Sequence, residues 1–264
     1  MLLLQKLNVL IVGDGNSIPL IKKSRFLKKL YITSSQEVEG VVNITFNTFK
    51  ELAQKCKALQ IDIVFVENEK WILQGIADVL RKNFVNCIAP TAKFAEQLLD
   101  STTARIILQR NGIDVPQKLT YPQNFPLLIR GKGFKLKVNS FEELLHVKEK
   151  MNKVFSREII DTAFLEEFIE GDIIYLNSFY DGKTLKTFAD GLLNEIEILE
   201  YSKALQNLLI NEKANFIGFL VSKLLIKKGK CYNVAFSFDY LATEFGMDFL
   251  YLLNAGIYQK LNEV

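Results

Sequence analysis

The chain has 264 residues, of which 49% are hydrophobic and 24% charged, so we expect a globular protein of one to three domains with a sizeable core. Its formal net charge is only +3, which argues against nucleic acid as a partner. The three cysteines form no CxxC pair and are expected to be buried thiols in a reducing compartment. Gln5 and Lys6 interrupt the apolar start, which indicates a buried strand and not a signal peptide or a membrane span. We therefore expect a cytoplasmic protein with no membrane contact.

Strand-like and helix-like segments alternate in the first third of the chain. Apolar runs of strand length lie at 7–12, 29–33, 41–44, 62–66 and 85–88, with helical patterns at 47–59 and 72–83. This order predicts a small doubly wound parallel α/β domain. Ligands of such sheets lie at the carboxyl ends of the strands, which would put residues 13–17 and 67–69 near any site.

The turn after the first strand contains Gly13, Gly15 and Asn16. Its backbone N–H groups could face a phosphate, but the third glycine of a dinucleotide motif is missing because residue 18 is Ile18. A plain strand–helix turn is the alternative.

The pattern changes in the remainder of the chain. Residues 100–103 mark a break between two helices and the start of the second one, and Asn111-Gly112 marks its end. Beyond it we expect strands at 125–129 and 132–138, a helix capped by Ser140, a strand within 159–168, strand pairs at 173–188 and 216–238, and a helix at 240–261. This order predicts an α+β region.

Two features of that region bear on chemistry. His146 is the single histidine and is predicted to be a surface residue of a helix, so neither a zinc site nor a Ser-His-Asp triad is expected. The run from Glu166 to Gly171 contains three acids. It indicates either a strand end with solvated acids or a hinge whose backbone contacts a purine, and composition does not decide between the two.

The order of the parts resembles the ATP-grasp enzymes, in particular the phosphoribosylamine–glycine ligase family. The resemblance covers nearly the whole chain to Phe238. It rests on VLIVGDGN at 9–16, Glu69 with Gly75–Asp78, Ala89-Pro90-Thr91, Asn111-Gly112-Ile113, Pro126–Arg130 and LEEFIEG at 165–171.

The resemblance implies an architecture and an activity. The fold would be an N-terminal doubly wound (pre-ATP-grasp) domain at 1–92 and a reduced two-lobed ATP-grasp domain at 93–264. The small lobe would span about 113–170 and the second lobe 171–264. The activity would be ATP-dependent carboxylate–amine ligation in purine nucleotide biosynthesis, with ATP and Mg²⁺ as cofactors and a small-molecule substrate.

The resemblance also implies site residues. Arg105 and Arg130 match two lysines that contact the nucleotide phosphates, and Asp172 is the acid nearest the ribose position, where Ile173 stands. The adenine hinge matches Glu167, Phe168 and Ile169. The substrate side matches Gly13, Gly15, Asn16, Glu69, Pro90 and Thr91.

The departures from the family lie at the ribose position, at the shortened loop Gly131-Lys132-Gly133, at the amine-substrate segment 15–19 and at the metal. Ala235 and Ser237 stand where the family has a magnesium-binding Glu and Asn, and a methyl group cannot coordinate a hard cation. We therefore assign no metal ligand at these two positions. Asp239 and Glu244 are the acids that could supply a metal ligand in their place. Loss of such acids would cost on the order of 10³-fold in rate.

Two hypotheses follow from these departures. One is an active ligase that uses Mg-ATP. The other, slightly favoured, is a catalytically inactive homologue without a metal cofactor that acts as a nucleotide-binding module or contacts a protein partner. A homo-oligomer or a partner chain is compatible with either.

Overall fold

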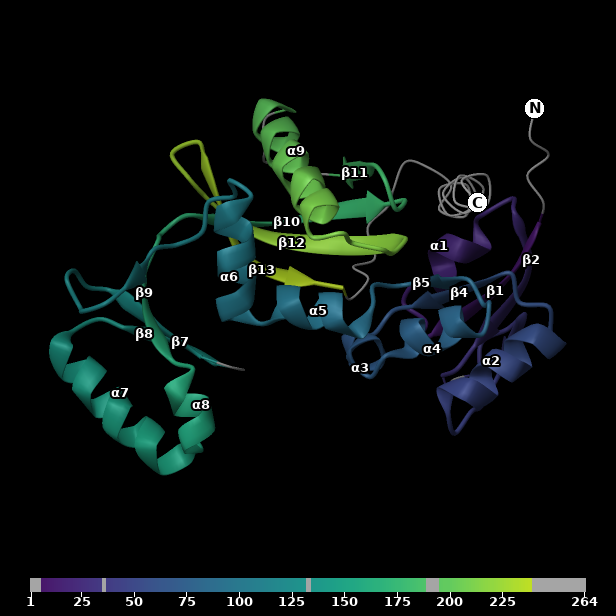
Figure 1. Ribbon diagram of the computed structural model, residues 1–264, viewed down its shortest axis with the longest axis horizontal. Coiled ribbons are helices and arrows are strands. Elements are labelled where there is room, and N and C mark those ends of the chain that lie inside the picture. The colour runs from purple at the N-terminus through teal and green to yellow at the C-terminus, as the bar shows by residue number, and fades with distance from the viewer. Residues whose placement is uncertain (1–5, 35–36, 132–133, 189–194, 239–264) are drawn as a thin grey trace.

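The structure is a computed structural model, and it describes residues 6–34, 37–131, 134–188 and 195–238. These residues form one parallel sheet and two antiparallel sheets (Figure 1). In Figure 1 the parallel sheet lies at the right, the smaller antiparallel sheet at the left, and the larger one between and above them. No helix in the described ranges is both long and apolar enough to cross a membrane.

The parallel sheet has the order β3-β2-β1-β4-β5, and the predicted parallel sheet is thus confirmed. All residues of the central strands β1 and β4 are buried, as expected for a sheet that helices cover on both faces. The strands are β1 (Leu7–Val12), β2 (Leu27–Ile32), β3 (Val41–Asn43), β4 (Ile63–Val66) and β5 (Cys87–Ile88). The helices between them are α1 (Ile18–Lys22), α2 (Phe49–Ala58), α3 (Glu69–Leu73) and α4 (Ile76–Lys82).

Two helices, α5 (Ala92–Leu99) and α6 (Ser101–Arg110), connect the parallel sheet to the rest. Asp100 separates them, and its carboxylate accepts a hydrogen bond from the backbone N–H of Thr103 at 2.8 Å. This is the N-cap arrangement that short polar side chains favour. The predicted break between two helices is confirmed.

The smaller antiparallel sheet has the order β6-β9-β7-β8. Its own core lies under α7 and consists of Leu127, Ile129, Val138, Leu144 and Met151. The strands are β6 (Lys118–Leu119), β7 (Leu127–Gly131), β8 (Phe134–Val138) and β9 (Phe164–Glu167), with helices α7 (Phe141–Val154) and α8 (Arg157–Asp161).

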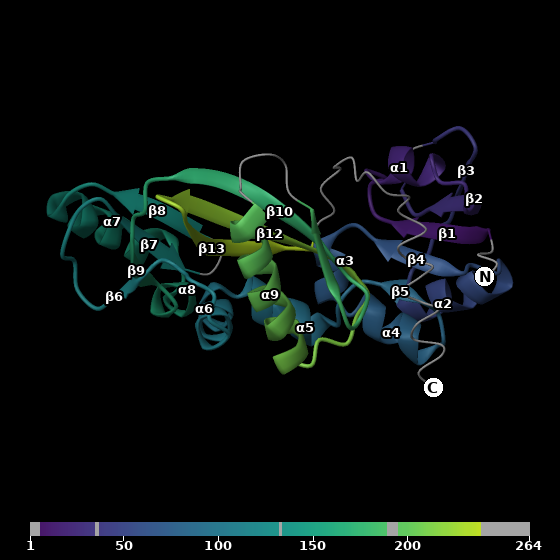
Figure 2. The same ribbon diagram turned by 90° about the horizontal axis from the view of Figure 1, so that it is seen from above.

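The larger antiparallel sheet has the order β11-β10-β12-β13, and α9 (Glu195–Asn211) packs on it. Both predicted strand pairs are confirmed, with turns at Asp181-Gly182 and Lys228-Gly229. Figure 2 shows its long strands running from the small sheet toward the parallel sheet. They are β10 (Asp172–Tyr180), β11 (Leu185–Phe188), β12 (Gly218–Lys227) and β13 (Lys230–Ser237).

The larger antiparallel sheet and the parallel sheet share buried cores. The rings of Phe65 and Phe219 lie 6.1 Å apart, and those of Phe94 and Phe216 lie 5.6 Å apart. The small sheet has a separate core. The domain boundary at residue 92 stays a prediction.

Candidate functional site

Two adjoining cavities lie between the two antiparallel sheets, and a third lies beside them between the smaller sheet and helices α5 and α6. The innermost, of about 80 Å³, is lined by Arg105, Arg130, Glu166 and Asn233 among others. A second, of about 170 Å³, shares Glu166 with it and includes the hinge, and a third, of about 710 Å³, shares Arg130. Lys135 lines both outer cavities. The three cavities therefore form one continuous cleft with cations at its centre.

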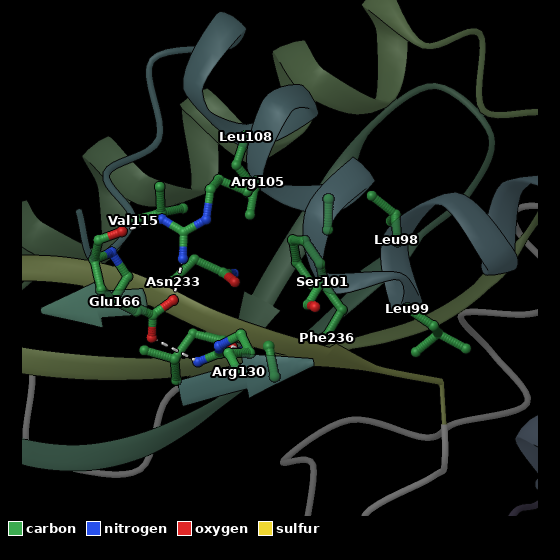
Figure 3. Close-up of a pocket in the computed structure, with 14 residues that line it drawn as sticks. Leu98, Leu99, Ser101, Arg105, Leu108, Val115, Arg130, Glu166, Asn233 and Phe236 are labelled. Atoms are coloured by element: carbon green, nitrogen blue, oxygen red, sulfur yellow. Dashed lines mark hydrogen bonds and ion pairs between the residues drawn. The ribbon is translucent and has the colours of Figure 1, made fainter. Parts of the chain in front are cut away.

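Arg105 and Arg130 converge on the carboxylate of Glu166 (Figure 3). One Nη atom of Arg105 donates to Glu166 Oε2 and the other to the Pro116 carbonyl. Arg130 Nη2 donates to Glu166 Oε1 at 3.0 Å, and its Nη1 donates to the Val234 carbonyl at 3.1 Å. The two arginines predicted to contact nucleotide phosphates thus lie together, with an internal carboxylate between them.

The alternation of β9 explains why Glu166 faces inward. Phe164 and Glu166 are buried, whereas Leu165 and Glu167 are half-buried, as the period of two in a strand requires. The Arg105 guanidinium lies 5.2 Å from the centre of the Phe164 ring. The hypothesis that the acids of this run are all solvated is wrong for Glu166, whose exposed fraction is 0%.

The charges of this centre do not cancel, because two guanidinium groups face one carboxylate. Burial lowers the pKa of Arg105, an effect that Glu166 opposes and Arg130 reinforces. Partial desolvation, then Arg130, also lower the pKa of Lys135 from its ordinary 10.5, although this lysine is exposed on β8. The Nε atoms of both arginines are buried without a partner among the described residues. The innermost cavity therefore retains surplus positive charge and unused donors, which favour an anion, while the acids Glu96, Asp100, Glu167 and Glu170 line the two outer cavities.

The predicted hinge lies in the cavity of about 170 Å³, which Glu167, Phe168 and Ile169 line together with Leu128, Ile173, Leu225 and Val234. Lys137 Nζ lies 4.1 Å from the centre of the Phe168 ring. A Cβ at Gly171 would come within 2.2 Å of the Ile226 carbonyl oxygen, so glycine is required there. This mostly apolar cavity suits a planar base. Ile173 is among its lining residues and Asp172 is not.

The backbone donors of the turn after β1 have a partner within the protein. The backbone N–H groups of Gly15, Asn16 and Ser17 donate to the carboxylate of Glu67 at 2.8, 3.1 and 2.5 Å. A Cβ at Gly13 would lie 2.8 Å from the Glu67 Cβ atom. The donors that could have faced a phosphate are thus held by a side chain of the protein.

The other predicted substrate-side residues have structural contacts. Glu69 Oε1 accepts from the backbone N–H of Phe238 at 2.8 Å, which ties α3 to the end of β13. Thr91 caps α5 by accepting from Phe94 N at 3.3 Å, and Pro90 is buried. The residues predicted on the substrate side are not among those that line the cleft cavities.

The metal positions of the family do not fit magnesium here. Ala235 lines the innermost cavity and Ser237 ends β13, and neither carries a carboxylate. In the described part of the chain, no group of three or more His, Cys, Asp or Glu side chains is arranged to hold a metal ion. The substitutes Asp239 and Glu244 lie outside the described residues. His146 is exposed on α7, as predicted.

Sequence reasoning missed the role of Glu166 and the position of Lys135. The alternation of 164–167 would have put Glu166 on the same face as Phe164, and Lys135 shares a face of β8 with Lys137. The pairing of Glu166 with α6 had no local signal, since Arg105 lies 61 residues earlier.

Comparisons with known proteins decide the fold. The biotin carboxylase domain of the Hydrogenobacter thermophilus 2-oxoglutarate carboxylase, solved with MgADP, ADP and bicarbonate, superposes with a TM-score of 0.70 at 12% identity. The match covers 95% of this chain and 69% of that one. The chain has the ATP-grasp fold. No protein-family model matches it.

Several sequence relatives of this ATP-grasp chain are named as purine biosynthetic proteins or as phosphoribosylamine–glycine ligases. It is 24% identical to the bifunctional purine biosynthetic protein purD of Dictyostelium discoideum, over 68% of this chain but only 25% of that protein. It is 22% identical to the phosphoribosylamine–glycine ligase of Fusobacterium nucleatum, over 98% of this chain and 75% of that protein. The resemblance to phosphoribosylamine–glycine ligase is thereby confirmed.

Proposed function

We propose that this ATP-grasp protein binds an adenine nucleotide in the cleft between its two antiparallel sheets, without magnesium and without ligation. The observation that carries the proposal is the cationic centre of Arg105, Arg130 and Lys135, which adjoins an apolar hinge cavity and lacks the family's metal acids. The base would lie against Phe168 and Ile169. The phosphates would lie at the cations.

The absence of carboxylates at two positions of β13 supports a binding role over a catalytic one. Phosphoryl transfer needs charge stabilisation by metal ions held by hard oxygen ligands. Ala235 offers none, and Ser237 offers one neutral hydroxyl. Free nucleotide needs only the cations and the donors that the cleft already has.

The second candidate function is that of the relatives, ATP-dependent carboxylate–amine ligation in purine nucleotide biosynthesis with Mg-ATP. The names of the curated relatives favour it. It requires that Asp239 or Glu244 supply a metal ligand. Turnover with phosphoribosylamine, glycine and Mg-ATP that Arg130→Ala abolishes would establish it and would sink the first proposal.

The proposal is tested by calorimetric titration of ATP into the purified protein in the presence of EDTA. We expect micromolar binding, lost in Arg130→Ala and kept in Arg110→Ala. Arg110 is a matched control because it also pairs with a glutamate, Glu212, but its side chain is 55% exposed and does not line the cleft. Absence of heat in the wild-type protein, with the fold verified by circular dichroism, would refute nucleotide binding.

A further inference from the structure

The centre of the cleft contains an anion that belongs to the protein. Glu166 is fully buried, and each of its carboxylate oxygens accepts from a different arginine. Each arginine gives one Nη donor to Glu166 and the other to a backbone carbonyl, so the carboxylate bridges two guanidinium groups through single charge-assisted hydrogen bonds, which a phosphate oxygen can also accept. The position that an oxyanion would take between Arg105 and Arg130 is therefore held by a side chain.

We propose that Glu166 is a built-in counterion that competes with the phosphate groups of a ligand for Arg105 and Arg130, and so sets how tightly the cleft binds anions. The proposal rests on the proposed function for the identity of the ligand as a nucleotide. The competition itself does not depend on the proposed function, because it can be measured with inorganic phosphate.

The electrostatic argument has two parts. A phosphate entering the cleft gains the attraction of Arg105, Arg130 and Lys135, but it also meets the negative charge of Glu166, which solvent does not screen because that side chain is fully buried. Both arginines already have one Nη donor on Glu166, while their Nε donors have no partner among the described residues. A ligand would therefore share the guanidinium groups with Glu166 or displace it.

Removal of the carboxylate should convert the centre into an open anion site. Glu166→Ala leaves two buried guanidinium groups without their counterion, a state that an oxyanion from solution relieves. Anything that binds the folded state alone raises the unfolding temperature. Inorganic phosphate should therefore raise the Tm of Glu166→Ala by several degrees more than that of the wild-type protein, on the order of 4 °C or more at about 100 times the Kd.

The experiment measures Tm against sodium phosphate concentration, with sodium chloride at equal ionic strength as the reference. Glu212→Ala is the matched control because Glu212 also pairs with an arginine, Arg110, at a place outside the cleft. A larger phosphate-dependent shift in Glu166→Ala than in both other proteins supports the proposal. Equal shifts in all three proteins overturn it.

If Glu166→Ala fails to fold even in phosphate, a second variant, Glu166→Gln, tests the proposal. Glu166→Gln keeps the size of the side chain and removes its charge, so its Kd for ATP in EDTA should fall by about tenfold or more relative to wild type. An unchanged or higher Kd overturns the proposal. If the wild-type protein binds no nucleotide but phosphate stabilises Glu166→Ala selectively, the competition stands and the proposed nucleotide function fails.

Discussion

The turn after β1 and the cleft between the antiparallel sheets both contain a buried carboxylate, but the charges around the two differ. Glu67 accepts from three uncharged backbone N–H groups, so that site keeps a negative charge. Glu166 accepts from two guanidinium groups, so that site keeps a positive one. Of the two sites, only the one around Glu166, in the innermost cavity of the cleft, is therefore suited electrostatically to an anionic ligand.

The comparison shows that donors alone do not make a binding site. Sequence reasoning put anion donors in both regions, and the structure contains both sets of donors. The two regions differ in the net charge of the donor groups taken together with the protein's own carboxylate, which is negative at the turn and positive around Glu166. Four experiments break or sharpen this difference.

The largest effect is expected for Glu166→Ala measured in a buffer free of phosphate. Removal of one partner from a buried ion pair leaves uncompensated charge, which costs about 3–5 kcal/mol. Urea denaturation should show this loss, whereas Glu212→Ala should lose less, about 1–2 kcal/mol, because its partner Arg110 is 55% exposed although the Glu212 side chain is only 11% exposed. Equal losses in the two variants would contradict the assigned burial.

A smaller loss is expected for Glu67→Ala. Three backbone N–H groups lose their acceptor, but Asn16 is exposed and its N–H can bond to water, so we expect a cost of about 2–3 kcal/mol. Urea denaturation measures it, and Glu149→Ala on the exposed side of α7 should change stability by less than about 0.5 kcal/mol. A Glu67→Ala variant as stable as wild type would show that the turn does not depend on this carboxylate.

The pH dependence of ATP binding should report on Lys135. Its pKa lies below 10.5 in the free protein because of partial desolvation and Arg130, and a neighbouring phosphate favours the protonated amine. The affinity should therefore fall severalfold as the pH rises through this lowered pKa toward 10.5. Titrations of wild type and Lys135→Met across that range test this, since the variant should bind more weakly and lack this slope. A slope that survives in Lys135→Met would assign it to another group.

The smallest effect is expected for Asp172→Asn. Asp172 is exposed and does not line the hinge cavity, whereas the adjacent Ile173 does. The Kd for ATP should change by less than about twofold in Asp172→Asn and should rise severalfold in Ile173→Ala, which removes apolar contact with the ligand. Fluorescence competition measures both. The reverse order would restore Asp172 to the ribose position.

Much of the fold could be predicted from local patterns. Strands β1 and β4 are continuous apolar runs, and the strand pair around Asp181-Gly182 has a specific turn signal. Arg105 and Arg130 were found through the order of the motifs. Glu166 was not, because an acidic residue next to a turn is usually solvated and its partners are distant in sequence. The role of Glu67 was likewise hidden, since its acceptor function depends on a contact with a turn about 50 residues earlier.

The central claim is that the cleft binds nucleotide through its own cations and not through a metal. The most direct test is the ratio of the Kd values for ATP measured by calorimetry in EDTA and in excess Mg²⁺. The account predicts micromolar binding in EDTA and a Kd that magnesium does not lower. Binding that appears only with magnesium, or that magnesium tightens by about tenfold or more, would contradict it and would point to a metal site and to the ligase activity of the relatives.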